Sequence, residues 1–367
     1  MTTAATPLPA LLEPGDLAPW FHAPVFGGRA DWAFNSAAGA PVLMFMMGSA
    51  AEPTVAAALA KLRARAALFD DERARFFGVT SDPSDVSADR IKRETGGVRY
   101  FLDNDFAIAK LYRAANDPTA YRPHLLLLDR ALQVVNRYPM AAVEAAIADL
   151  EELIAAPGQD WAPVLTVPNL FEPALCQRLM ALYDSSGGEP SGFVREVEGK
   201  TTIITDPLFK QRRDAMIDDA ELRSAIMGRI SRKLVPAVQR SYQFTANRIE
   251  RYIVAAYDAG AGHFRPHRDN TTKGTAHRRF AVTINLNSDY DGGDLKFPEF
   301  GQRTYRAPPG GAVVFSCSLL HEATNVTRGR RYACLPFLYD DAAAAIREAN
   351  NAFLGGDIAQ YRAGASA

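Results

Sequence analysis

The chain has few cysteines, no surplus of charge of either sign and no long hydrophobic run. Its three cysteines, Cys176, Cys317 and Cys334, are widely spaced and odd in number, which argues against a disulfide framework or a cysteine zinc site. The formal net charge is −1, from 41 basic and 42 acidic residues, so we expect no nucleic-acid or membrane partner. The most apolar run, residues 41–51, is shorter than the roughly 20 residues of a spanning helix. Residues 1–20 lack the features of a signal peptide. A cytoplasmic protein is expected.

The length and composition predict two domains. With 367 residues, of which 48% are hydrophobic, the chain is too long for one ordinary core. Residues 157–163 contain proline, glycine and polar residues that break any periodic pattern, so they are expected to form a linker. We therefore expect one domain at residues 1–157 and a second at residues 158–367.

The first of these domains alternates between strand-like and helix-like patterns, as an α/β layer does. The expected strands span residues 41–47, 74–80, 98–102, 124–128 and 132–135. The expected helices span residues 53–68, 84–94, 105–113 and 141–155.

Three segments of this first domain, 12–21, 78–82 and 122–129, resemble the peroxiredoxin branch of the thioredoxin fold. The loop after the first long strand, residues 48–54, contains no cysteine. Thiol peroxidase chemistry needs a thiolate, and neither Ser49 nor Thr54 can replace it at neutral pH. We therefore expect this domain to be catalytically silent.

The second domain carries helical patterns first and short strands afterwards. Helices are expected at residues 169–183 and within 218–244. Strands are expected at residues 251–257, 262–267, 279–286, 294–297, 311–317 and 331–338. Short strands separated by glycine-bearing turns are typical of a double-sheet jelly roll, or double-stranded β-helix, here with supporting helices.

His267 and Asp269 lie two residues apart on an extended segment, so their side chains point the same way. A second histidine, His321, follows a predicted buried strand. Two imidazoles and one carboxylate on one face of a metal leave the opposite positions open, as in non-haem iron(II) oxygenases.

Arg331 is the residue that a carboxylate-bearing co-substrate would need. We expect a hairpin after His321 to return Arg331 on the neighbouring strand, inside the barrel and below the metal. A guanidinium there can hold a carboxylate through two parallel hydrogen bonds. Tyr257, expected to point inward, could donate a third.

Residues 161–341 resemble the prolyl-4-hydroxylase-type branch of the iron(II) and 2-oxoglutarate-dependent dioxygenases. The motif that carries the resemblance consists of Tyr257, His267, Asp269, Gly292, Gly293, Leu295, His321, Gly329 and Arg331. The resemblance implies that His267, Asp269 and His321 bind Fe(II). It also implies that Arg331 binds the distal carboxylate of 2-oxoglutarate with help from Tyr257. Asn285 lies on a strand expected to face the co-substrate, but no motif fixes its role.

The activity implied by this resemblance is hydroxylation of an unactivated carbon. O2 is consumed, succinate and CO2 are released, and ascorbate is expected to stimulate turnover. The substrate class stays open between a peptide, a protein, an amino acid and another small molecule. Loops at residues 187–206 and 270–277 are expected to set selectivity, and the first domain is a candidate homodimer face or docking site.

Two other functions remain open from the residues alone. A zinc-dependent hydrolase could use the same three ligands with an open fourth position, but it would not need Arg331. A non-catalytic redoxin-type binding protein would suit the first domain, although all three metal-binding residues of the second domain are present. His263 is expected to be structural or at the rim. His277, Arg278 and Arg279 are expected in a solvated loop, and Cys317 and Cys334 in the core.

Overall fold

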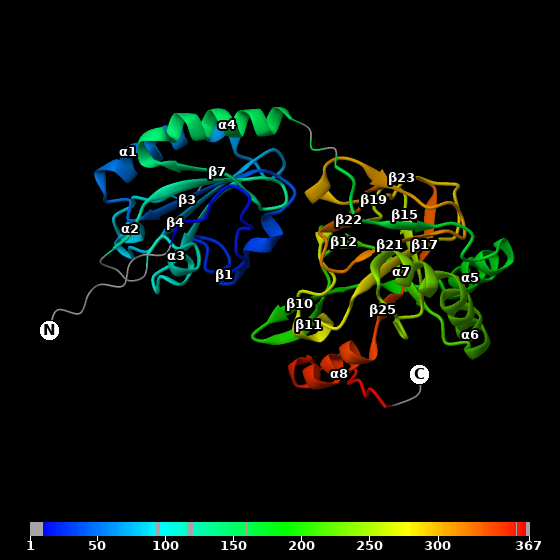
Figure 1. Ribbon diagram of the computed structural model, residues 1–367. Helices are drawn as coiled ribbons and strands as arrows, with labels where there is room; N and C mark the ends of the chain where they lie inside the picture. The colour runs from blue at the N-terminus through cyan, green and yellow to red at the C-terminus, as the bar shows by residue number, and fades with distance from the viewer. Residues whose placement is uncertain are drawn as a thin grey trace. The chain divides into compact units, whose positions relative to one another are not determined.

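The computed structural model describes residues 10–92, 96–115, 120–156, 158, 160–356 and 358–364. The chain divides into two compact units (Figure 1). Unit 1 comprises Met1–Asp160 with Pro298–Gln302, and unit 2 comprises Trp161–Phe297 with Arg303–Ala367.

Unit 1 contains a five-stranded sheet with the strand order β5-β4-β3-β6-β7. Its strands are β3 (Val42–Gly48), β4 (Arg75–Thr80), β5 (Val98–Leu102), β6 (His124–Leu128) and β7 (Val134–Pro139), preceded by the small pair β1 (His22–Ala23) and β2 (Trp32–Ala33). The helices are α1 (Pro53–Ala64), α2 (Ser84–Ser87), α3 (Ala107–Leu111) and α4 (Val143–Ala155). Strands β3, β4 and β5 run parallel to one another. Strand β6 runs antiparallel to β3, and β7 runs antiparallel to β6.

The sheet of unit 1 is buried on both faces, which explains its continuous apolar strands. Helices α1 and α4 cover one face, where Leu59 and Leu150 pack against Phe45 (Figure 1). An aromatic cluster covers the other face, with Phe77 and Phe101 in edge-to-face contact at 5.5 Å between ring centroids. The α/β layer expected from the sequence is confirmed.

The expected helix at residues 84–94 is wrong for most of its length. Helix α2 ends at Ser87 because Asp89 adopts a left-handed conformation with φ 52°. The amides of Arg90 and Ile91 then donate to the carbonyl of Asp85, which closes a turn. Residues 93 and 94 of that expectation lie outside the described residues, as do residues 157 and 159 of the expected linker.

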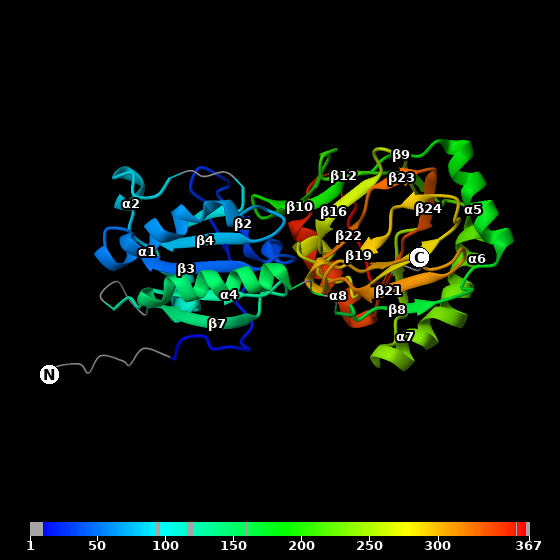
Figure 2. The same ribbon diagram turned by 90° about the horizontal axis from the view of Figure 1, so that it is seen from above.

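The helices of unit 2 pack on one face of its larger sheet (Figures 1 and 2). They are α5 (Pro173–Ser186), α6 (Ala220–Arg229), the π-helical turn η4 (Ile230–Leu234) and α7 (Val235–Tyr242). Helix α8 (Asp341–Ala349) lies apart from them and packs with Tyr339. The expected helical pattern over residues 218–244 is one almost continuous element. Pro236 has no amide hydrogen to donate one turn back, and the chain passes through the π turn just before it.

Two sheets make up most of unit 2. The larger contains β8 (Leu165–Val167), β9 (Glu189–Pro190), β13 (Arg213–Met216), β14 (Arg248–Glu250), β15 (Ile253–Asp258), β17 (Phe280–Asn285), β21 (Ala312–Ser316), β24 (Arg330–Cys334) and β25 (Phe337–Tyr339). The smaller contains β12 (Lys210–Gln211), β16 (His263–His267), β19 (Leu295–Lys296), β20 (Thr304–Tyr305) and β22 (His321–Ala323). Two further pairs are β10 (Phe193–Val197) with β11 (Lys200–Ile204), and β18 (Asp291–Gly292) with β23 (Val326–Arg328).

The alternation of side chains along β15 sets the inside of unit 2. Val254 and Ala256 face the helices, whereas Ile253, Ala255 and Tyr257 pack against Phe264 and Ala323 of the smaller sheet. The side chains of Tyr257 and Arg331, which are cross-strand partners on β15 and β24, therefore point between the two sheets.

Two further expectations for unit 2 need correction. The strand expected at residues 331–338 is broken into β24 and β25 at Pro336, which cannot donate to a sheet ladder. The expected selectivity loop at residues 187–206 contains the antiparallel pair β10 and β11 instead. Its polar composition hid the strand pattern.

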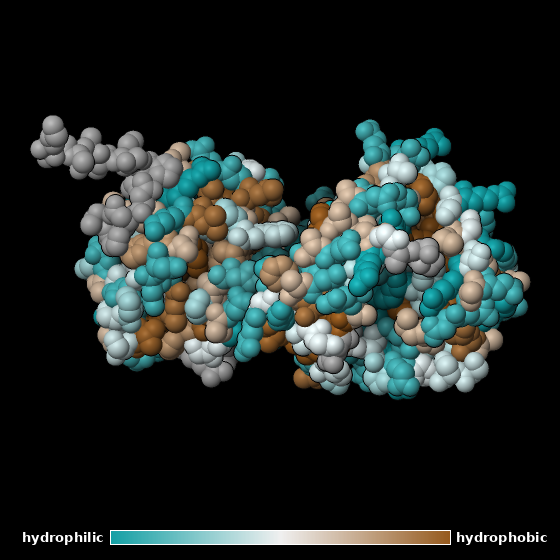
Figure 3. Space-filling view, turned by 90° about the horizontal axis from the view of Figure 1, so that it is seen from below, coloured by the Kyte–Doolittle hydropathy of each residue, from teal (hydrophilic) through white to brown (hydrophobic). Residues whose placement is uncertain are grey.

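No helix among the described residues is long and apolar enough to cross a membrane. The visible face in Figure 3 is mostly hydrophilic, and hydrophobic residues appear on it as scattered patches. Scattered apolar residues are normal on a folded protein surface.

Candidate metal centre

A β-bulge in β16 brings two histidines together. Phe264 pairs with Ala323, and three residues later His267 pairs with His321, only two residues back on β22. The extra residue on β16 turns the side chain of His267 to the same side as Phe264, and the two rings stack with centroids 3.4 Å apart. Pro266 lies in the bulge, where an amide hydrogen is not needed.

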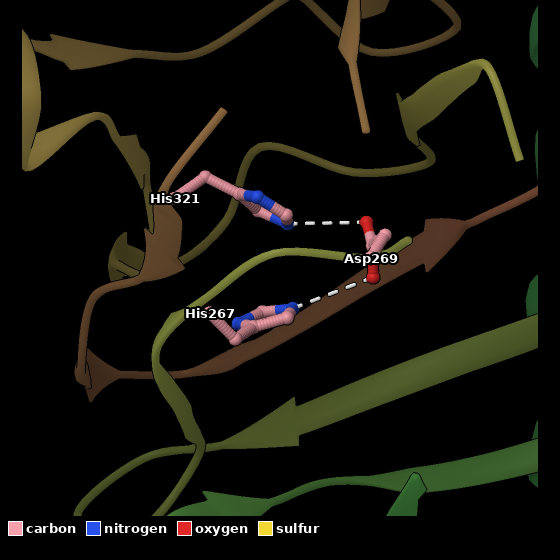
Figure 4. Close-up of side chains that lie close together, drawn as sticks. All are labelled: His267, Asp269 and His321. Atoms are coloured by element: carbon pink, nitrogen blue, oxygen red, sulfur yellow. Dashed lines mark ion pairs between the residues drawn. The ribbon is translucent and has the colours of Figure 1, made fainter. Parts of the chain in front are cut away.

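His267, Asp269 and His321 form a candidate metal centre (Figure 4). Nε2 of His267 lies 3.6 Å from Oδ1 of Asp269, and Nε2 of His321 lies 3.3 Å from Oδ2. One ligand atom from each residue falls within 4.8 Å of the others. Ligands about 2.1 Å from a metal at right angles to one another are separated by about 3 Å, so the cluster fits one ion.

Backbone carbonyls fix the tautomer of both imidazoles. Nδ1 of His267 lies 2.8 Å from the carbonyl oxygen of Arg265, and Nδ1 of His321 lies 3.0 Å from that of Leu319. A carbonyl can only accept, so Nδ1 carries the hydrogen of the neutral ring and Nε2 presents a lone pair. Two lone pairs and a carboxylate repel one another unless a cation lies between them, and this arrangement is typical of metal ligands.

The protonation states also fit metal binding. Burial, together with the charge of His321, lowers the pKa of His267 to about 4. Burial opposes ionisation of Asp269, but the interactions with His321 and His267 outweigh it and hold the pKa of Asp269 well below its ordinary value. At neutral pH, His267 is therefore neutral and Asp269 is ionised, which are the forms that bind a metal.

The cluster lies in a pocket between the two sheets, lined by residues of both. Apolar side chains such as Phe264, Leu295 and Phe315 line part of it. Three arginines, Arg212, Arg251 and Arg331, line it as well. A pocket with three guanidinium groups is suited to anionic ligands.

Arg331 is buried in this pocket with only 2% of its surface exposed. Its Nη2 donates to Oδ1 of Asn285 at 3.2 Å, and its guanidinium lies 5.2 Å from the ring centroid of Tyr257. Its Nε has no hydrogen-bond partner, and no carboxylate lies within 4.0 Å of it, in the described part of the chain. A buried guanidinium with an unsatisfied donor suits an anionic ligand.

The expected position of Arg331 on the strand beside His321 is wrong. His321 lies on β22 of the smaller sheet, whereas Arg331 lies on β24 of the larger sheet. The intervening segment forms β23, which pairs with β18 and separates the two strands. The two residues nevertheless line the same pocket, because both side chains point between the sheets.

Tyr257 and Asn285 occupy different places around Arg331. Tyr257 lines the pocket, and its hydroxyl accepts a hydrogen bond from Nη1 of Arg212 at 3.3 Å. Asn285 is buried, and its Nδ2 donates to the carbonyl of Ala307 at 2.7 Å while its Oδ1 accepts from Arg331. Both ends of the Asn285 amide are thus used within the protein.

Other histidines of unit 2 have structural partners. His263 has the carbonyls of Ala261 and Leu208 beside its two ring nitrogens, at 2.7 and 3.2 Å. His277 is 1% exposed and bonds Glu250 at 2.7 Å, and Arg278 pairs with the same carboxylate at 2.9 Å. The expected solvated loop is therefore wrong for His277 and Arg278, which form a buried charged cluster.

Arg212 and Arg251 are pocket residues that the sequence did not single out. Arg212 is paired with Asp214, and the alternating pattern i, i+2 was the only available sign of that pair. Arg251 precedes β15 and carries no motif. Charged residues next to a strand are common on protein surfaces, so neither guanidinium could be expected inside from the residue pattern.

The loop of unit 1 at residues 48–54 forms hydrogen bonds with two aspartates of the segment that follows β4. The hydroxyl of Ser49 donates to Asp82 at 2.6 Å, and the amide of Ala50 donates to Asp85 at 2.9 Å. The three cysteines of the chain all lie in unit 2 and are buried. Burial raises the pKa of Cys176 to about 11 and that of Cys334 to about 12, so neither is a reactive thiolate at neutral pH.

Comparison with known families matches each unit to a separate family. Residues 252–339 match the 2OG-Fe(II) oxygenase superfamily, and residues 14–137 match the AhpC/TSA family. The chain therefore joins an oxygenase-superfamily region to an AhpC/TSA region. The region that matches the AhpC/TSA family contains no cysteine.

Curated relatives of the oxygenase region are PKHD-type hydroxylases. One from a Synechococcus strain is 30% identical over 97 residues, which cover 24% of this chain and 43% of the relative. Another from Nitrosomonas europaea is 29% identical over 140 residues, covering 35% of this chain and 58% of the relative. The chain thus spans about half the length of these relatives.

A solved prolyl-4-hydroxylase from Pseudomonas putida is 21% identical, with a TM-score of 0.37, and the match covers 53% of this chain and 98% of that one. A prolyl hydroxylase from Trichoplax adhaerens, solved with a hypoxia inducible factor peptide fragment, is 16% identical, with a TM-score of 0.38. That match covers 50% of this chain and 86% of the other.

Proposed function

We propose that unit 2 is an Fe(II)- and 2-oxoglutarate-dependent dioxygenase that hydroxylates an unactivated carbon of its substrate. One observation carries this proposal: the His267–Asp269–His321 cluster shares a pocket with a buried arginine that has an unsatisfied donor. The three residues would hold Fe(II), and Arg331 would hold the distal carboxylate of 2-oxoglutarate. The larger and smaller sheets would then be the two halves of a double-stranded β-helix.

Bound iron, 2-oxoglutarate and O2 supply the oxidising chemistry, with release of succinate and CO2. The chain's own residues bind and orient these groups. Leu319 and Arg265 hold the two imidazoles in the ligand tautomer through their carbonyls. Asn285 holds the guanidinium of Arg331 in place, so we assign Asn285 to positioning Arg331 and not to direct contact with the co-substrate. Tyr257 contributes a hydroxyl and a ring face to the same end of the pocket.

A zinc-dependent hydrolase is the second candidate, since two histidines and one aspartate can also hold Zn²⁺ with an open position. It leaves the buried, unbalanced charge of Arg331 without a purpose. The oxygenase proposal uses that charge, and we therefore favour it.

The first test is succinate formation from 2-oxoglutarate with added Fe(II) and ascorbate, before and after admission of O2. We expect oxygen-dependent uncoupled turnover, stimulated by ascorbate, that His267→Ala and Arg331→Ala abolish. The control is His22→Gln, because His22 is 60% exposed and lies in unit 1. Absence of turnover together with absence of iron-dependent 2-oxoglutarate binding would contradict the proposal.

For the first domain, residues 1–157, we propose a non-catalytic role as a homodimer face or a substrate-docking surface of a cytoplasmic enzyme. Its support is a retained α/β layer without a thiol. The test compares the whole chain with the fragment 160–367 by light scattering, thermal unfolding and succinate formation. Equal oligomeric state, stability and activity in the fragment would contradict this role.

A further inference from the structure

The three arginines that line the pocket differ in what balances their charge. Arg212 donates to both oxygens of Asp214, with two distances of 2.7 Å. Arg331 faces the position proposed for 2-oxoglutarate. Arg251 has no carboxylate within 4.0 Å among the described residues. Neither a carboxylate of the described chain nor the proposed co-substrate therefore pairs with Arg251.

The protein holds Arg251 by one edge of its guanidinium. Nε and Nη2 both donate to the carbonyl of Leu335, at 3.2 and 3.1 Å. The guanidinium also lies over the ring of Phe337, 4.6 Å from its centroid. Nη1 makes no hydrogen bond within the described part of the chain, so the Nη1–Nη2 edge keeps two parallel N–H groups. That fork matches the two oxygens of one carboxylate.

Arg251 and Arg331 lie toward different ends of the pocket. Tyr257 and Arg331 are cross-strand partners, whereas Arg251 precedes Tyr257 by six residues and contacts Leu335. At about 3.3 Å per residue along a strand, six residues separate the backbone positions of the two arginines by about 20 Å. A molecule as short as 2-oxoglutarate, bound to the metal and to Arg331, leaves Arg251 unused.

Among the three arginines that line the pocket, the charge of Arg251 is the one left over. Asp214 balances Arg212. Glu250 pairs with Arg278, whose guanidinium also lies 4.1 Å from the ring centroid of Phe337. A divalent metal with Asp269, together with Arg331 and the two carboxylates of 2-oxoglutarate, sums to zero. Burial, with the charges of Arg212 and Arg278, lowers the pKa of Arg251 to about 10, although the more distant carboxylates of Asp214 and Asp269 act in the opposite direction. A buried unpaired charge is costly, so an arginine kept in this state is suited to a charged ligand.

We propose that the substrate of unit 2 carries a carboxylate, and that the free edge of Arg251 binds it. This inference rests on the proposed oxygenase function and names the substrate class of the same site. The carboxylate could belong to a free amino acid or other small acid, or to an acidic side chain of a peptide. The chemistry recognised by Arg251 is the same in each case.

The test uses the full-length protein with Mn(II), which replaces Fe(II) without turnover, and saturating 2-oxoglutarate. Calorimetry measures the binding of matched probes that differ only in a carboxylate. One panel pairs each free L-amino acid with its amide, and the other pairs acetylated dipeptide amides that contain glutamate or glutamine. With Fe(II), the same probes are scored for succinate released above the uncoupled rate.

We expect the carboxylate member of at least one pair to bind at least about tenfold tighter, equivalent to about 1.4 kcal/mol. Arg251→Gln should abolish this preference without changing the affinity for 2-oxoglutarate, and Arg251→Lys should retain part of it. Arg248→Gln is the matched control, because Arg248 already pairs with Asp341 at 2.8 Å. Preference in the first panel identifies a small acid as the source, and preference confined to the second identifies a peptide.

Two results would overturn the inference alone: no carboxylate preference in the wild-type protein that has bound 2-oxoglutarate, or a preference that survives in Arg251→Gln. The wild-type comparison needs no variant, so it stands even if a substitution at position 251 unfolds the protein. Failure of the wild-type protein to bind 2-oxoglutarate with Mn(II) would overturn this inference together with the proposed function.

Discussion

The loop of unit 1 at residues 48–54 and the metal centre of unit 2 treat polar groups in opposite ways. In the loop, Ser49 bonds Asp82 and the amide of Ala50 bonds Asp85. In the metal centre, the imidazole lone pairs of His267 and His321 face a carboxylate with no donor between them. In the loop, these groups are hydrogen-bonded to other residues of unit 1. In the metal centre, the buried lone pairs face one another and need a ligand between them.

This difference separates a retained fold from a retained site. Unit 1 keeps a five-stranded sheet and the loop at residues 48–54. This loop is hydrogen-bonded to Asp82 and Asp85, and it contains no thiol. Unit 2 keeps Arg331 buried with an unsatisfied Nε. An unsatisfied buried group costs about 1–3 kcal/mol, and this one lies in the same pocket as the metal-binding cluster, which supports ligand binding there.

The largest effect should come from removing the carboxylate of the metal centre. Asp269→Ala is expected to lower Fe(II) affinity and 2-oxoglutarate turnover by more than about 100-fold, since residues that only orient a ligand typically contribute about 10–100-fold. Metal content after dialysis and succinate release are the measurements. Asp291→Ala, at an exposed aspartate paired with Arg328, should change neither. Equal losses in both variants would remove the contrast between the two regions.

The next effect concerns the buried arginine. Arg331→Gln should weaken 2-oxoglutarate binding by about 30-fold or more, because truncating one member of a buried charge pair costs about 2–5 kcal/mol. Its neighbour Arg330 has 43% of its side chain exposed and pairs with Asp258, so Arg330→Gln should bind 2-oxoglutarate as the wild type does. Titration of the Mn(II) protein with 2-oxoglutarate distinguishes them, and similar affinities in the two variants would refute the assignment.

A smaller effect is expected when the positioning residue is changed. Asn285→Ala leaves Nη2 of Arg331 without its acceptor and should raise the KM for 2-oxoglutarate about 5- to 10-fold, from a loss of about 1 kcal/mol. The kcat should stay close to the wild-type value, since Asn285 does not line the pocket. Asn285→Asp adds an anion that competes for Arg331 and should raise KM further. A fall in kcat with unchanged KM would contradict a positioning role.

The smallest effect should come from the loop of unit 1. Hydrogen bonds from Ser49 and Ser84 lower the pKa of Asp82 from 3.8 to about 2, so this carboxylate stabilises the fold above pH 3.8 and loses that contribution as the pH falls to 2. Ser49→Ala should raise the pKa of Asp82 and cost about 1 kcal/mol of unfolding free energy at neutral pH. The difference from wild type should disappear near pH 2.

Unfolding by urea at several pH values measures this loop effect, and carboxyl NMR signals report the pKa of Asp82 directly. Succinate formation should be unchanged in Ser49→Ala. A loss of activity equal to that of a metal-centre variant would show that the loop takes part in the chemistry, contrary to the comparison.

Local patterns were sufficient for much of the fold. The buried apolar run of β3 and the helix α4 follow from hydrophobic periodicity, and the bounds differ by a few residues at most. The strand broken at Pro336 and the short α2 depended on tertiary partners that local patterns do not contain. The pair β10 and β11 was missed because polarity does not follow burial along it: Val197 and Ile203 are exposed, whereas Thr201 is buried.

For the site, the i, i+2 spacing suggested only that His267 and Asp269 share a face. Placing His321 beside them rested on the strand pattern before it and on the family resemblance. The sheet that carries Arg331 could not be predicted, since the short strand β23 intervenes after His321. Arg251 could not be found either. Its importance lies in the absence of a neighbouring anion, and an absence in space leaves no trace in a sequence.

The bulge in β16 gives the centre a property that no single side chain has. The orientation of His267 depends on the number of residues between Phe264 and His267 that the bulge accommodates. A regular ladder continued from Phe264 and Ala323 would pair Pro266 with His321 and turn His267 to the opposite face of the strand. In this strand, an irregularity of the backbone decides which side chain meets His321, so the centre depends on the bulge as well as on its three ligands.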